Sequence, residues 1–189
     1  MIPGHLLAGC YPGAPDPEVS AGKLQAVFGV GVRCMVNLME PEERNYRNGA
    51  LFADYSDIFT EIAAEQRKKV SCLRFPVRDL DVPDVGLMHR ILDSIDAAIE
   101  TGRPVYVHCQ DGIGRTGTAV GCYLIRRGLA DAETVIERIQ QLREGVDSQS
   151  PWLSPETLDQ VKFVETWHRH ENFSDYQSPP YLFLTMCQF

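Results

Sequence analysis

Cys109 and Arg115, six positions apart, are the two residues of this chain best suited to do chemistry together. They lie in V-Y-V-H-C-Q-D-G-I-G-R-T-G, residues 105 to 117. A cysteine thiolate is a strong nucleophile, and a guanidinium can hold two oxygens of an oxyanion in bidentate fashion. The pair therefore predicts attack by sulfur on a phosphoryl group.

The residues around this pair predict a strand, a glycine-containing loop and a helix. Residues 105 to 107 are β-branched or aromatic, and residues 118 to 125 form a second apolar run. Gly112 and Gly114 let the backbone approach a ligand closely. The N–H groups of such a loop and the positive end of the helix dipole behind it form an anion-binding site, which also stabilises a thiolate.

This segment resembles the signature loop of cysteine-dependent protein tyrosine and dual-specificity phosphatases, H-C-x-x-G-x-G-R-[ST]-G. The matching residues are His108, Cys109, Gly112, Gly114, Arg115, Thr116 and Gly117. A looser match upstream, L-L-A-G-x-Y-P-G followed by a helix and G-V-x-x-x-V-N-L, resembles the N-terminal part of bacterial dual-specificity-like phosphatases. The alternative, a buried strand cysteine beside a glycine turn, does not account for so many coincident positions.

The resemblance implies a catalytic role for several of these residues. Cys109 is expected to take the phosphoryl group, and Thr116 to donate its hydroxyl to the Cys109 sulfur. His108 is expected to orient the loop through hydrogen bonds rather than to transfer protons. The residues implied to bind the phosphate are Gln110, Asp111, Gly112, Ile113, Gly114 and Arg115.

Hydrolysis of a phosphomonoester also needs an acid to protonate the leaving oxygen. The proline-bracketed segment F-P-V-R-D-L-D-V-P, residues 75 to 83, offers Asp79 and Asp81. In protein tyrosine phosphatases the acid lies four residues before a proline, and this spacing selects Asp79. Asp81 is then expected to point to solvent or to cap a turn, although it remains the alternative acid. Asp84 is interpreted as a helix cap.

Two weaker similarities to protein tyrosine phosphatases have simpler interpretations, which we favour. E-T-x-x-Q-x-x-F contains Gln160, but Glu156 occupies the position of the functional glutamine, so a surface helix is the favoured interpretation. Arg44-Asn45-Tyr46 resembles a phosphotyrosine-recognition loop, and a solvated connector is favoured there.

Alternating strand and helix patterns predict an α/β fold, a central mixed, mainly parallel sheet flanked by helices. One phosphatase domain over residues 1–189 is expected, with an irregular N-terminal segment (1–15) and a C-terminal tail (171–189) that docks on the domain or contacts a second copy. The expected strands are 32–38, 70–75 and 105–107, and the expected helices are 17–28, 58–69, 85–100, 116–127, one after Asp131 and one from Ser154. The inward residues of the last are expected to be Leu158, Val161, Phe163, Val164 and Trp167.

The composition and net charge of the chain argue against several classes of function. The net charge of −8 disfavours binding to nucleic acid or to anionic lipid. No signal peptide or membrane span is evident, so a cytoplasmic protein with no stable membrane association is expected. The six cysteines lack metal-site spacing, and no metal or cofactor is predicted. Cys34, Cys72 and Cys122 are expected in the core, with a protective disulfide to Cys109 left open.

These features favour a metal-independent phosphatase that acts through a cysteinyl-phosphate on phosphorylated proteins. Phosphotyrosine is the expected substrate, with phosphoserine and phosphothreonine left open. A phosphoinositide or other non-protein phosphatase is the main alternative, although Asp111 in the loop would repel a polyanionic head group. A non-catalytic phosphate-binding module is a further class.

Overall fold

A computed structural model describes residues 6–144, 153–171 and 184–187 and places five strands in one sheet. The strands are β1 (Leu6–Gly9), β2 (Cys34–Asn37), β3 (Ser71–Arg74), β4 (Val105–His108) and β5 (Leu184–Cys187). Their order is β3-β2-β4-β1-β5, and each pairing is parallel. The predicted α/β fold is confirmed, and the sheet is parallel throughout the described strands rather than mixed.

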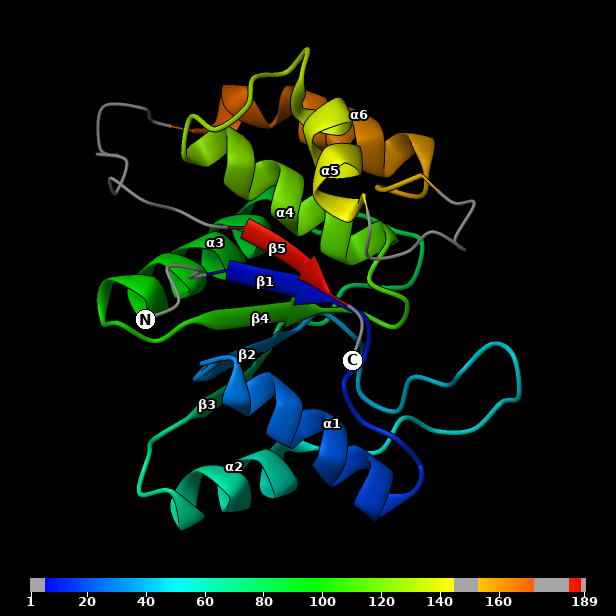
Figure 1. The fold of residues 1–189 in the computed structure, drawn as a ribbon. Coiled ribbons are helices and arrows are strands. Elements are labelled where there is room, and N and C mark those ends of the chain that lie inside the picture. Colours follow the sequence, from blue (N-terminus) through cyan, green and yellow to red (C-terminus); the bar gives the residue numbers. More distant parts are fainter. Residues whose placement is uncertain (1–5, 145–152, 172–183, 188–189) are drawn as a thin grey trace.

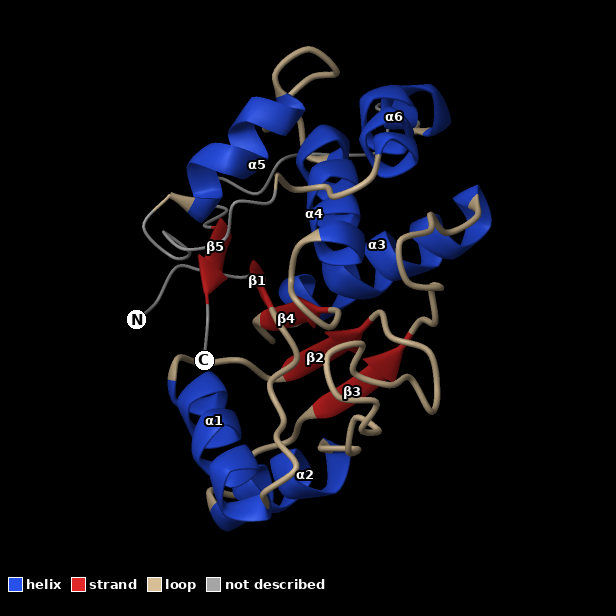
Figure 2. Ribbon diagram, turned by 90° about the vertical axis from the view of Figure 1, so that its right-hand side faces the viewer, coloured by secondary structure: helices blue, strands red, loops and turns tan. Residues whose placement is uncertain are grey.

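Helices cover both faces of this sheet (Figures 1 and 2). On one face lie α1 (Pro17–Gly29) and α2 (Ser56–Glu65). On the other lie α3 (Val85–Glu100), α4 (Gly114–Arg126), α5 (Val135–Arg143), α6 (Leu158–Thr166) and the 3₁₀ turn η1 (Trp167–His170). Both faces of a parallel sheet must be buried, which explains why its strands are apolar on both sides.

Side-chain alternation along β4 separates the core into two clusters. Val105, Val107 and Cys109 belong to the cluster under α3 and α4, whereas Tyr106 belongs to the cluster under α1 and α2. Because successive strand residues point to opposite faces, His108 lies on the α1 side and Cys109 on the α4 side. The side chain of Cys109 therefore faces α4, the helix that follows it.

The caps predicted for two helices are present. The side chain of Asp16 accepts hydrogen bonds from the N–H groups of Glu18 and Val19 at the start of α1. Asp84 accepts from the N–H of Leu87, 2.7 Å away, at the start of α3. Both caps satisfy N–H groups that have no partner within a helix, and both fix where the preceding loop ends.

Both chain ends differ from the sequence-based expectation. Residues 1–15 were expected to be irregular, but Leu6–Gly9 forms β1, a buried strand between β4 and β5. Within the predicted tail 171–189, Leu184–Cys187 pairs with β1 as β5, and most of the rest of that tail lies outside the described residues. β1 and β5 have only four residues each. An alternation of apolar and polar residues cannot be recognised over so short a segment, particularly next to glycine and proline.

The last helix also begins later than expected. Thr157 is its N-cap, and a capping box joins Thr157 to Gln160. Leu158, expected to point inward, is 77% exposed. The first turn of α6 therefore presents an apolar side chain to solvent, while Val164 and Trp167 fill the core as predicted.

Helix α4 is buried along its whole length, and glycine makes this possible. A Cβ built on Gly121 would lie 2.6 Å from Cγ1 of Val164 and 3.0 Å from Cδ1 of Ile139. The absence of a side chain at this position thus lets α5 and α6 pack directly on α4, which carries the signature-loop arginine in its first turn.

We expect Gly121→Ala to destabilise the protein by about 1–3 kcal/mol, because the added methyl group overpacks the α4–α6 contact. Gly22→Ala is the matched control, since nothing lies within 4 Å of its Cβ position on α1. That change should stabilise by about 0.5–1 kcal/mol through helix propensity. Urea unfolding of both variants measures the difference. Equal stabilities would contradict the packing role assigned to Gly121.

Candidate active site

The signature loop joins the end of β4 to the start of α4. Cys109 follows β4 directly and is 3% exposed, and Arg115 lies in the first turn of α4 and is 2% exposed. Neighbouring chain segments hold the loop by backbone hydrogen bonds of 2.9 Å, from Leu38 N–H to His108 C=O and from Tyr11 N–H to Gln110 C=O. The strand-loop-helix arrangement predicted around Cys109 is confirmed.

The backbone of this loop is rich in unpaired donors. Within the described parts of the chain, none of the N–H groups of residues 110–116 donates a hydrogen bond to a protein acceptor. The first N–H groups of a helix have no intrahelical partner, and consecutive unpaired N–H groups bind anions. The loop can therefore supply several N–H donors to one oxyanion next to the Cys109 sulfur.

Gly112 is required where the loop crosses the end of β1. Its φ is +73°, and a Cβ there would lie 2.5 Å from the carbonyl carbon of Gly9 and 2.7 Å from the nitrogen of Cys10. Neither the backbone conformation nor the contact tolerates a side chain. The strand β1, which was not predicted from the sequence, is thus the segment against which the signature loop packs.

Arg115 makes a bidentate ion pair with Glu43. Nη1 lies 2.7 Å from Oε2 and Nη2 lies 2.8 Å from Oε1, and Nη1 also donates to the carbonyl of Val77, at 3.1 Å. The Nε atom is buried and has no hydrogen-bond partner among the described residues. Protein groups therefore bind both Nη atoms of the guanidinium, whereas its Nε–H donor remains without an acceptor among the described residues.

Burial acts to lower the pKa of Arg115, but the hydrogen bonds to Glu43 and the charges of Cys109, Glu43 and Asp79 overcome that effect and raise it. The guanidinium is therefore a permanent, nearly dehydrated cation. A charge of this kind is retained in a protein interior only when it is paired.

Glu43 is the site residue that the sequence interpretation missed. Its side chain is 9% exposed, and it also accepts a hydrogen bond of 3.1 Å from Glu40 N–H. It lies in the segment M-E-P-E-E-R, which contains three glutamates, and nothing in the sequence indicates which of them contacts the signature loop. Only the contact with Arg115 in the folded chain distinguishes Glu43 from its neighbours.

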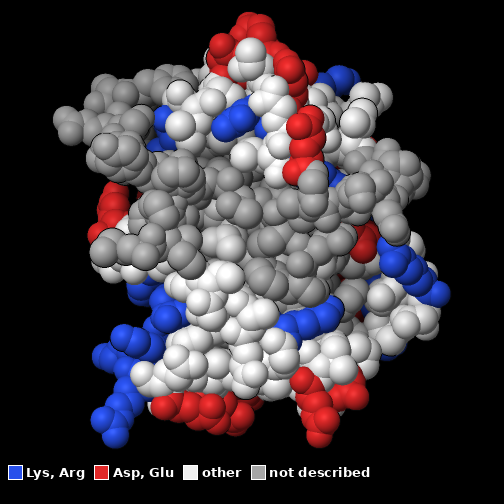
Figure 3. Space-filling model, in the orientation of Figure 1, with Lys and Arg blue, Asp and Glu red and all other residues white. Residues whose placement is uncertain are grey.

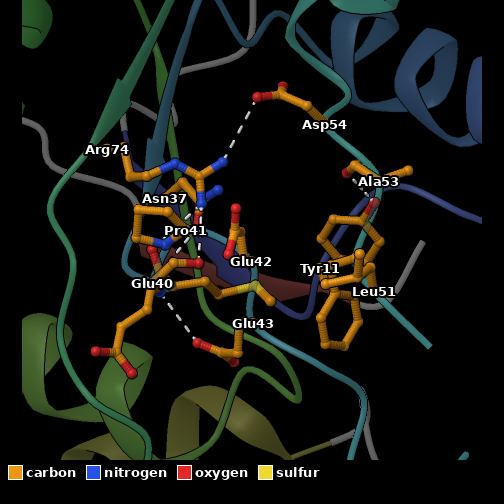
Figure 4. Close-up of a pocket in the computed structure, with 12 residues that line it drawn as sticks. Tyr11, Asn37, Glu40, Pro41, Glu42, Glu43, Leu51, Ala53, Asp54 and Arg74 are labelled. Carbon is orange, nitrogen blue, oxygen red and sulfur yellow. Dashed lines mark hydrogen bonds and ion pairs between the residues drawn. The ribbon is translucent and has the colours of Figure 1, made fainter. Parts of the chain in front are cut away.

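A cavity of about 290 Å³ lies beside Glu43 (Figure 4). Arg74 reaches across it, donating to the carbonyls of Met39 and Glu40 at 3.3 Å and approaching Asp54 at 3.6 Å. No residue of the signature loop lines this cavity. The cavity therefore lies next to the signature loop without including it, and Arg74 connects the Glu43 segment to β3.

The structure places Asp79, and not Asp81, against the signature loop. The Oδ1 atom of Asp79 lies 2.9 Å from Nη2 of Arg115, with the side chain half exposed. Asp81 accepts a hydrogen bond of 2.8 Å from Val82 N–H, which fits the turn-capping role expected of it. Leu80 between them has φ +63°, and this left-handed residue turns the two carboxyl groups apart.

Gln160 is fully buried, so the surface-helix interpretation of this residue was wrong. Its Oε1 accepts from the N–H groups of Glu156 and Thr157, and its Nε2 donates to the carbonyl of Asp81 at 3.0 Å. Gln160 thus connects the start of α6 to the acid-bearing loop. A buried amide is placed in this way only when each polar end finds a partner.

Glu156 lies at the edge of the signature loop. One of its carboxylate oxygens would be 3.1 Å from a Cβ on Gly114. Burial, and next the charges of Asp79 and Asp111, raise the pKa of Glu156, and Arg115 opposes them. Together with Asp79 and Asp111, this residue makes one side of the loop acidic.

His108 is buried and neutral. Its ring contacts the Tyr55 hydroxyl through Nε2 and the Cys109 carbonyl through Nδ1, at 3.2 Å. Burial lowers the pKa of His108 to about 3, against a raising effect of the Cys109 carbonyl and with small lowering effects of Arg74 and Arg115. These contacts fit the expected orienting role. Because its pKa is lowered, the imidazole carries no charge near neutral pH.

The expected hydrogen bond from Thr116 to the Cys109 sulfur is not formed in this structure. The Thr116 hydroxyl is buried and has no hydrogen-bond partner among the described residues. Cys10, Cys34, Cys72, Cys109 and Cys122 form no disulfide. Cys34 and Cys122 are buried as expected, whereas Cys72 is partly exposed. Burial raises the pKa of all three thiols, that of Cys72 to about 11.

The segment around Arg44-Asn45-Tyr46 is an exposed connector, as predicted, but it reaches the signature loop. Tyr46 is 65% exposed. Its neighbour Arg47 lies over the Tyr46 ring, 5.2 Å from its centroid, and 3.8 Å from the carboxylate of Asp111. An exposed aromatic ring and an arginine therefore flank the phosphate-binding loop on this side.

Two kinds of feature, a cluster of metal-ligating side chains and a helix able to span a membrane, are not found among the described residues. They contain no group of three His, Cys, Asp or Glu side chains able to hold a metal ion. None of the described helices is long and apolar enough to cross a bilayer. On the face seen in Figure 3, Lys and Arg side chains of the described residues form several separate groups, and acidic side chains gather mainly toward the top and bottom.

Removing the charge of Glu43 should destabilise the protein, because Arg115 would lose the main partner of its buried charge. We expect Glu43→Gln to lower the free energy of unfolding by about 2–3 kcal/mol. Added phosphate should stabilise this variant more than the parent, since the anion supplies the missing charge. Thermal unfolding with and without phosphate measures both effects. Glu42→Gln, at an exposed neighbour, is the control, and equal behaviour of the two variants would contradict the assignment.

Known proteins resemble this chain over a region that includes the signature loop. The family model described as "polymorphic toxin system, DSP-PTPase phosphatase" matches residues 13–129, more than half of the chain. A CDC14 homologue from Schizosaccharomyces pombe, a tyrosine-protein phosphatase, is 36% identical over 87 residues, 45% of this chain and 16% of that protein. An uncharacterised protein of Methanocaldococcus jannaschii, MJECL20, is 35% identical over 77 residues, 41% of this chain and 50% of that protein. The matched regions thus cover at most half of these relatives.

Solved structures show the same fold at low identity. Tk-PTP in its active form has a TM-score of 0.63 at 20% identity, covering 88% of this chain and 92% of that chain. PTPMT1 in complex with PI(5)P has 0.63 at 22%, with coverages of 89% and 94%. Kinase-associated phosphatase has 0.66 at 15%, with coverages of 91% and 89%. With the match over residues 13–129, the chain belongs to the DSP-PTPase phosphatases of polymorphic toxin systems, within the tyrosine and dual-specificity phosphatase superfamily.

Proposed function

We propose that this phosphatase hydrolyses phosphomonoesters of proteins through a cysteinyl-phosphate, without a metal ion. The observation that carries the proposal is the convergence of Cys109, the unpaired N–H groups of residues 110–116, and Arg115 on one loop. Asp79, 2.9 Å from Arg115, supplies a carboxyl group at the same place. A nucleophile, an oxyanion cradle and an acid are the complete set this reaction needs.

In the first step, the Cys109 sulfur attacks phosphorus and the bond from phosphorus to the substrate oxygen breaks. Arg115 and the loop N–H groups bind the phosphoryl oxygens, whose charge they stabilise in the transition state. The Asp79 carboxylate now paired with Nη2 of Arg115 gives way to a phosphoryl oxygen. In its protonated form, Asp79 then donates its proton to the leaving oxygen.

In the second step, a water molecule attacks the cysteinyl-phosphate. Asp79, left as a carboxylate, takes a proton from this water, the sulfur–phosphorus bond breaks, and phosphate is released with the Cys109 thiolate restored. A small rotation of the Thr116 hydroxyl, which is buried without a partner, would let it donate to the departing sulfur. This would assist the leaving thiolate.

The surroundings of the loop favour a protein substrate over a phosphoinositide. Asp111 and Glu156 place negative charge at the edge of the loop, which opposes a second phosphate there. Tyr46, Leu80 and Leu158 are more than half exposed on the segments that flank the site, and such apolar side chains suit an aromatic phosphoester and a peptide chain. Because PTPMT1 was crystallised with PI(5)P, a lipid remains the alternative substrate.

The proposal predicts metal-independent hydrolysis of phosphotyrosine peptides that depends on Cys109. Peptides with phosphotyrosine, phosphoserine or phosphothreonine and a set of phosphoinositides should be assayed in parallel with a chelator present. We expect phosphotyrosine to be the best substrate. Cys109→Ser should retain less than about a thousandth of the parental kcat, because a hydroxyl is scarcely ionised near neutral pH. Activity lost on chelation, or a preference for lipids over every peptide, would overturn the proposal.

The role of Asp79 can be tested through the leaving group. A positioned acid contributes about 10²–10⁴-fold when the leaving oxygen is poor and less when it is good. Asp79→Asn should therefore reduce kcat far more for a phosphotyrosine peptide than for nitrophenyl phosphate. Asp81→Asn is the matched control and should change the two rates little and equally. A large, leaving-group-dependent loss in Asp81→Asn alone would identify Asp81 as the acid instead.

A further inference from the structure

The edge of the sheet opposite the active site carries a group of basic side chains. Three turns lead into β2, β3 and β4 at this edge, formed by residues 30–33, 66–70 and 101–104. Together they contain five basic residues and no Asp or Glu, in a chain whose net charge is −8. We call these five residues the basic edge: Arg33, Arg67, Lys68, Lys69 and Arg103. Positive charge is therefore concentrated at one end of an acidic protein.

Backbone hydrogen bonds hold the three turns side by side. The N–H of Arg33 donates to the carbonyl of Pro104 at 2.8 Å, and the N–H of Ser71 donates to the carbonyl of Arg33 at 3.0 Å. The strands that follow are in register, with Cys34 beside both Ser71 and Val105. Because neighbouring strands lie about 4.8 Å apart, the turns form a row about 10 Å wide at one level of the sheet.

Two arginines of the basic edge are held against the protein surface. Arg33 donates from Nη1 to the carbonyl of Phe28 at 2.9 Å, and its guanidinium lies 3.8 Å from the centroid of the Phe28 ring. Arg103 donates to the hydroxyl of Thr101 at 3.0 Å and to that of Ser71 at 3.4 Å. These partners are all neutral groups, so the charges of both guanidinium groups remain uncompensated.

The other three basic side chains are exposed to solvent. Arg67, Lys68 and Lys69 follow directly after the C-cap of α2. In Figure 3, Lys and Arg side chains gather at the lower left, over the end of α2 and the start of β3. None of the five side chains of the basic edge forms an ion pair with a carboxylate of the described residues. The basic edge thus presents its charge to the surroundings.

Part of this charge stabilises the fold itself. The helices α1, α2 and α3 all end at this edge, and each helix end carries about half a negative charge. Glu65 and Glu100, the last residues of α2 and α3, add two carboxylates. The five cations outnumber both sources of negative charge together. An excess of positive charge therefore remains for a partner.

The shape and composition of the basic edge fit a planar anionic surface. None of the large exposed apolar side chains, which anchor most protein interfaces, lies in the three turns. The turns also contain no aromatic ring on which the bases of a single-stranded nucleic acid could stack. An anionic lipid bilayer needs neither, since each basic residue near its surface increases the affinity by about fivefold through charge alone.

The acidic residues of the active site lie too far from this edge to prevent such binding. They follow the carboxyl ends of the strands, to which the arrows in Figure 1 point. A strand of four residues spans about 13 Å, which exceeds the Debye length of about 8 Å at physiological salt. The net charge of −8 therefore does not describe what the basic edge presents to a surface. Repulsion of the acidic end instead favours one orientation.

We propose that the basic edge is a reversible docking surface for anionic lipid bilayers. It holds the protein at the membrane by charge alone, with the signature loop on the side that faces away from the bilayer. In this orientation a phosphoprotein at the membrane surface can reach Cys109, whereas a headgroup of the docked bilayer cannot. The inference concerns binding rather than turnover, so its test does not depend on the proposed function.

The test is sedimentation of the protein with lipid vesicles. One set contains phosphatidylcholine alone, and the other contains equal amounts of phosphatidylcholine and anionic phosphatidylglycerol. At low salt we expect binding to the anionic vesicles only. This binding should disappear in 1 M salt, where the Debye length shortens to about 3 Å. Absence of binding to the anionic vesicles, or equal binding to both sets, would overturn the proposal.

Paired charge reversals assign the binding to the basic edge. The double variant Lys68→Glu/Lys69→Glu should bind anionic vesicles at least about 10²-fold more weakly, because two cations are lost and two repelled carboxylates are added. The control Lys23→Glu/Lys162→Glu makes the same change of net charge at the two other lysines of the chain, in α1 and α6. It should bind within about twofold of the parent. An equal loss in both double variants would show that net charge alone governs binding, against the proposal.

Soluble polyanions separate a bilayer from other partners. Polyglutamate and a single-stranded oligonucleotide, added at the same concentration of negative charge as the vesicles, should leave the protein on the vesicles. Release of the protein by either polyanion would identify an acidic protein or a nucleic acid as the better partner and would refute membrane docking. Thermal unfolding of Lys68→Glu/Lys69→Glu should match that of the parent, since both side chains are exposed, which excludes misfolding as the cause of lost binding.

Discussion

The structure of this site depends on a buried positive charge. Arg115 is 2% exposed, and a guanidinium in that position costs several kcal/mol of desolvation unless partners replace its water. Glu43 provides two charge-assisted hydrogen bonds, Val77 a carbonyl and Asp79 a third carboxylate oxygen. Two separate chain segments, one with Glu43 and one with Val77 and Asp79, must therefore be in place around the arginine. The guanidinium so fixed is pre-organised for an oxyanion, and little of the binding energy is lost in ordering it.

Those segments meet because the sheet is parallel. The carboxyl ends of parallel strands lie at one edge, and ligand sites of open α/β sheets form there. The Glu43 segment follows β2, the Asp79 loop follows β3, and Cys109 follows β4. The end of β1 lies beneath Gly112. Each part of the proposed chemistry is thus the continuation of a strand, and the register of the sheet sets the distances between them.

Helix α6 adds a second layer of constraint on the acid-bearing loop. Gln160 binds the carbonyl of Asp81, and Thr157 donates to that of Leu80, at 3.4 Å. Ser154, in the segment before α6, donates to the carbonyl of Ile113 at 2.7 Å. One segment of the chain therefore contacts both the phosphate-binding loop and the acid loop. A substitution in that segment would therefore change the positions of both loops.

The sequence alone determined the local parts of the site. The Cys109-to-Arg115 spacing, the helix caps at Asp16 and Asp84, and the choice of Asp79 over Asp81 as the residue nearer the loop all depend on short-range patterns, which remain readable in one dimension. The alternation of strands and helices likewise predicted the fold class.

Tertiary structure decided what depends on contacts between distant segments. Glu43 is 72 residues from Arg115, and no local pattern distinguishes it from Glu42. Gln160 resembles a surface residue until its amide is seen to bind Asp81, 79 residues away. β1 is a strand because β4 and β5 pair with its backbone N–H and C=O groups on both sides. This pairing cannot be predicted from the four residues of β1 alone.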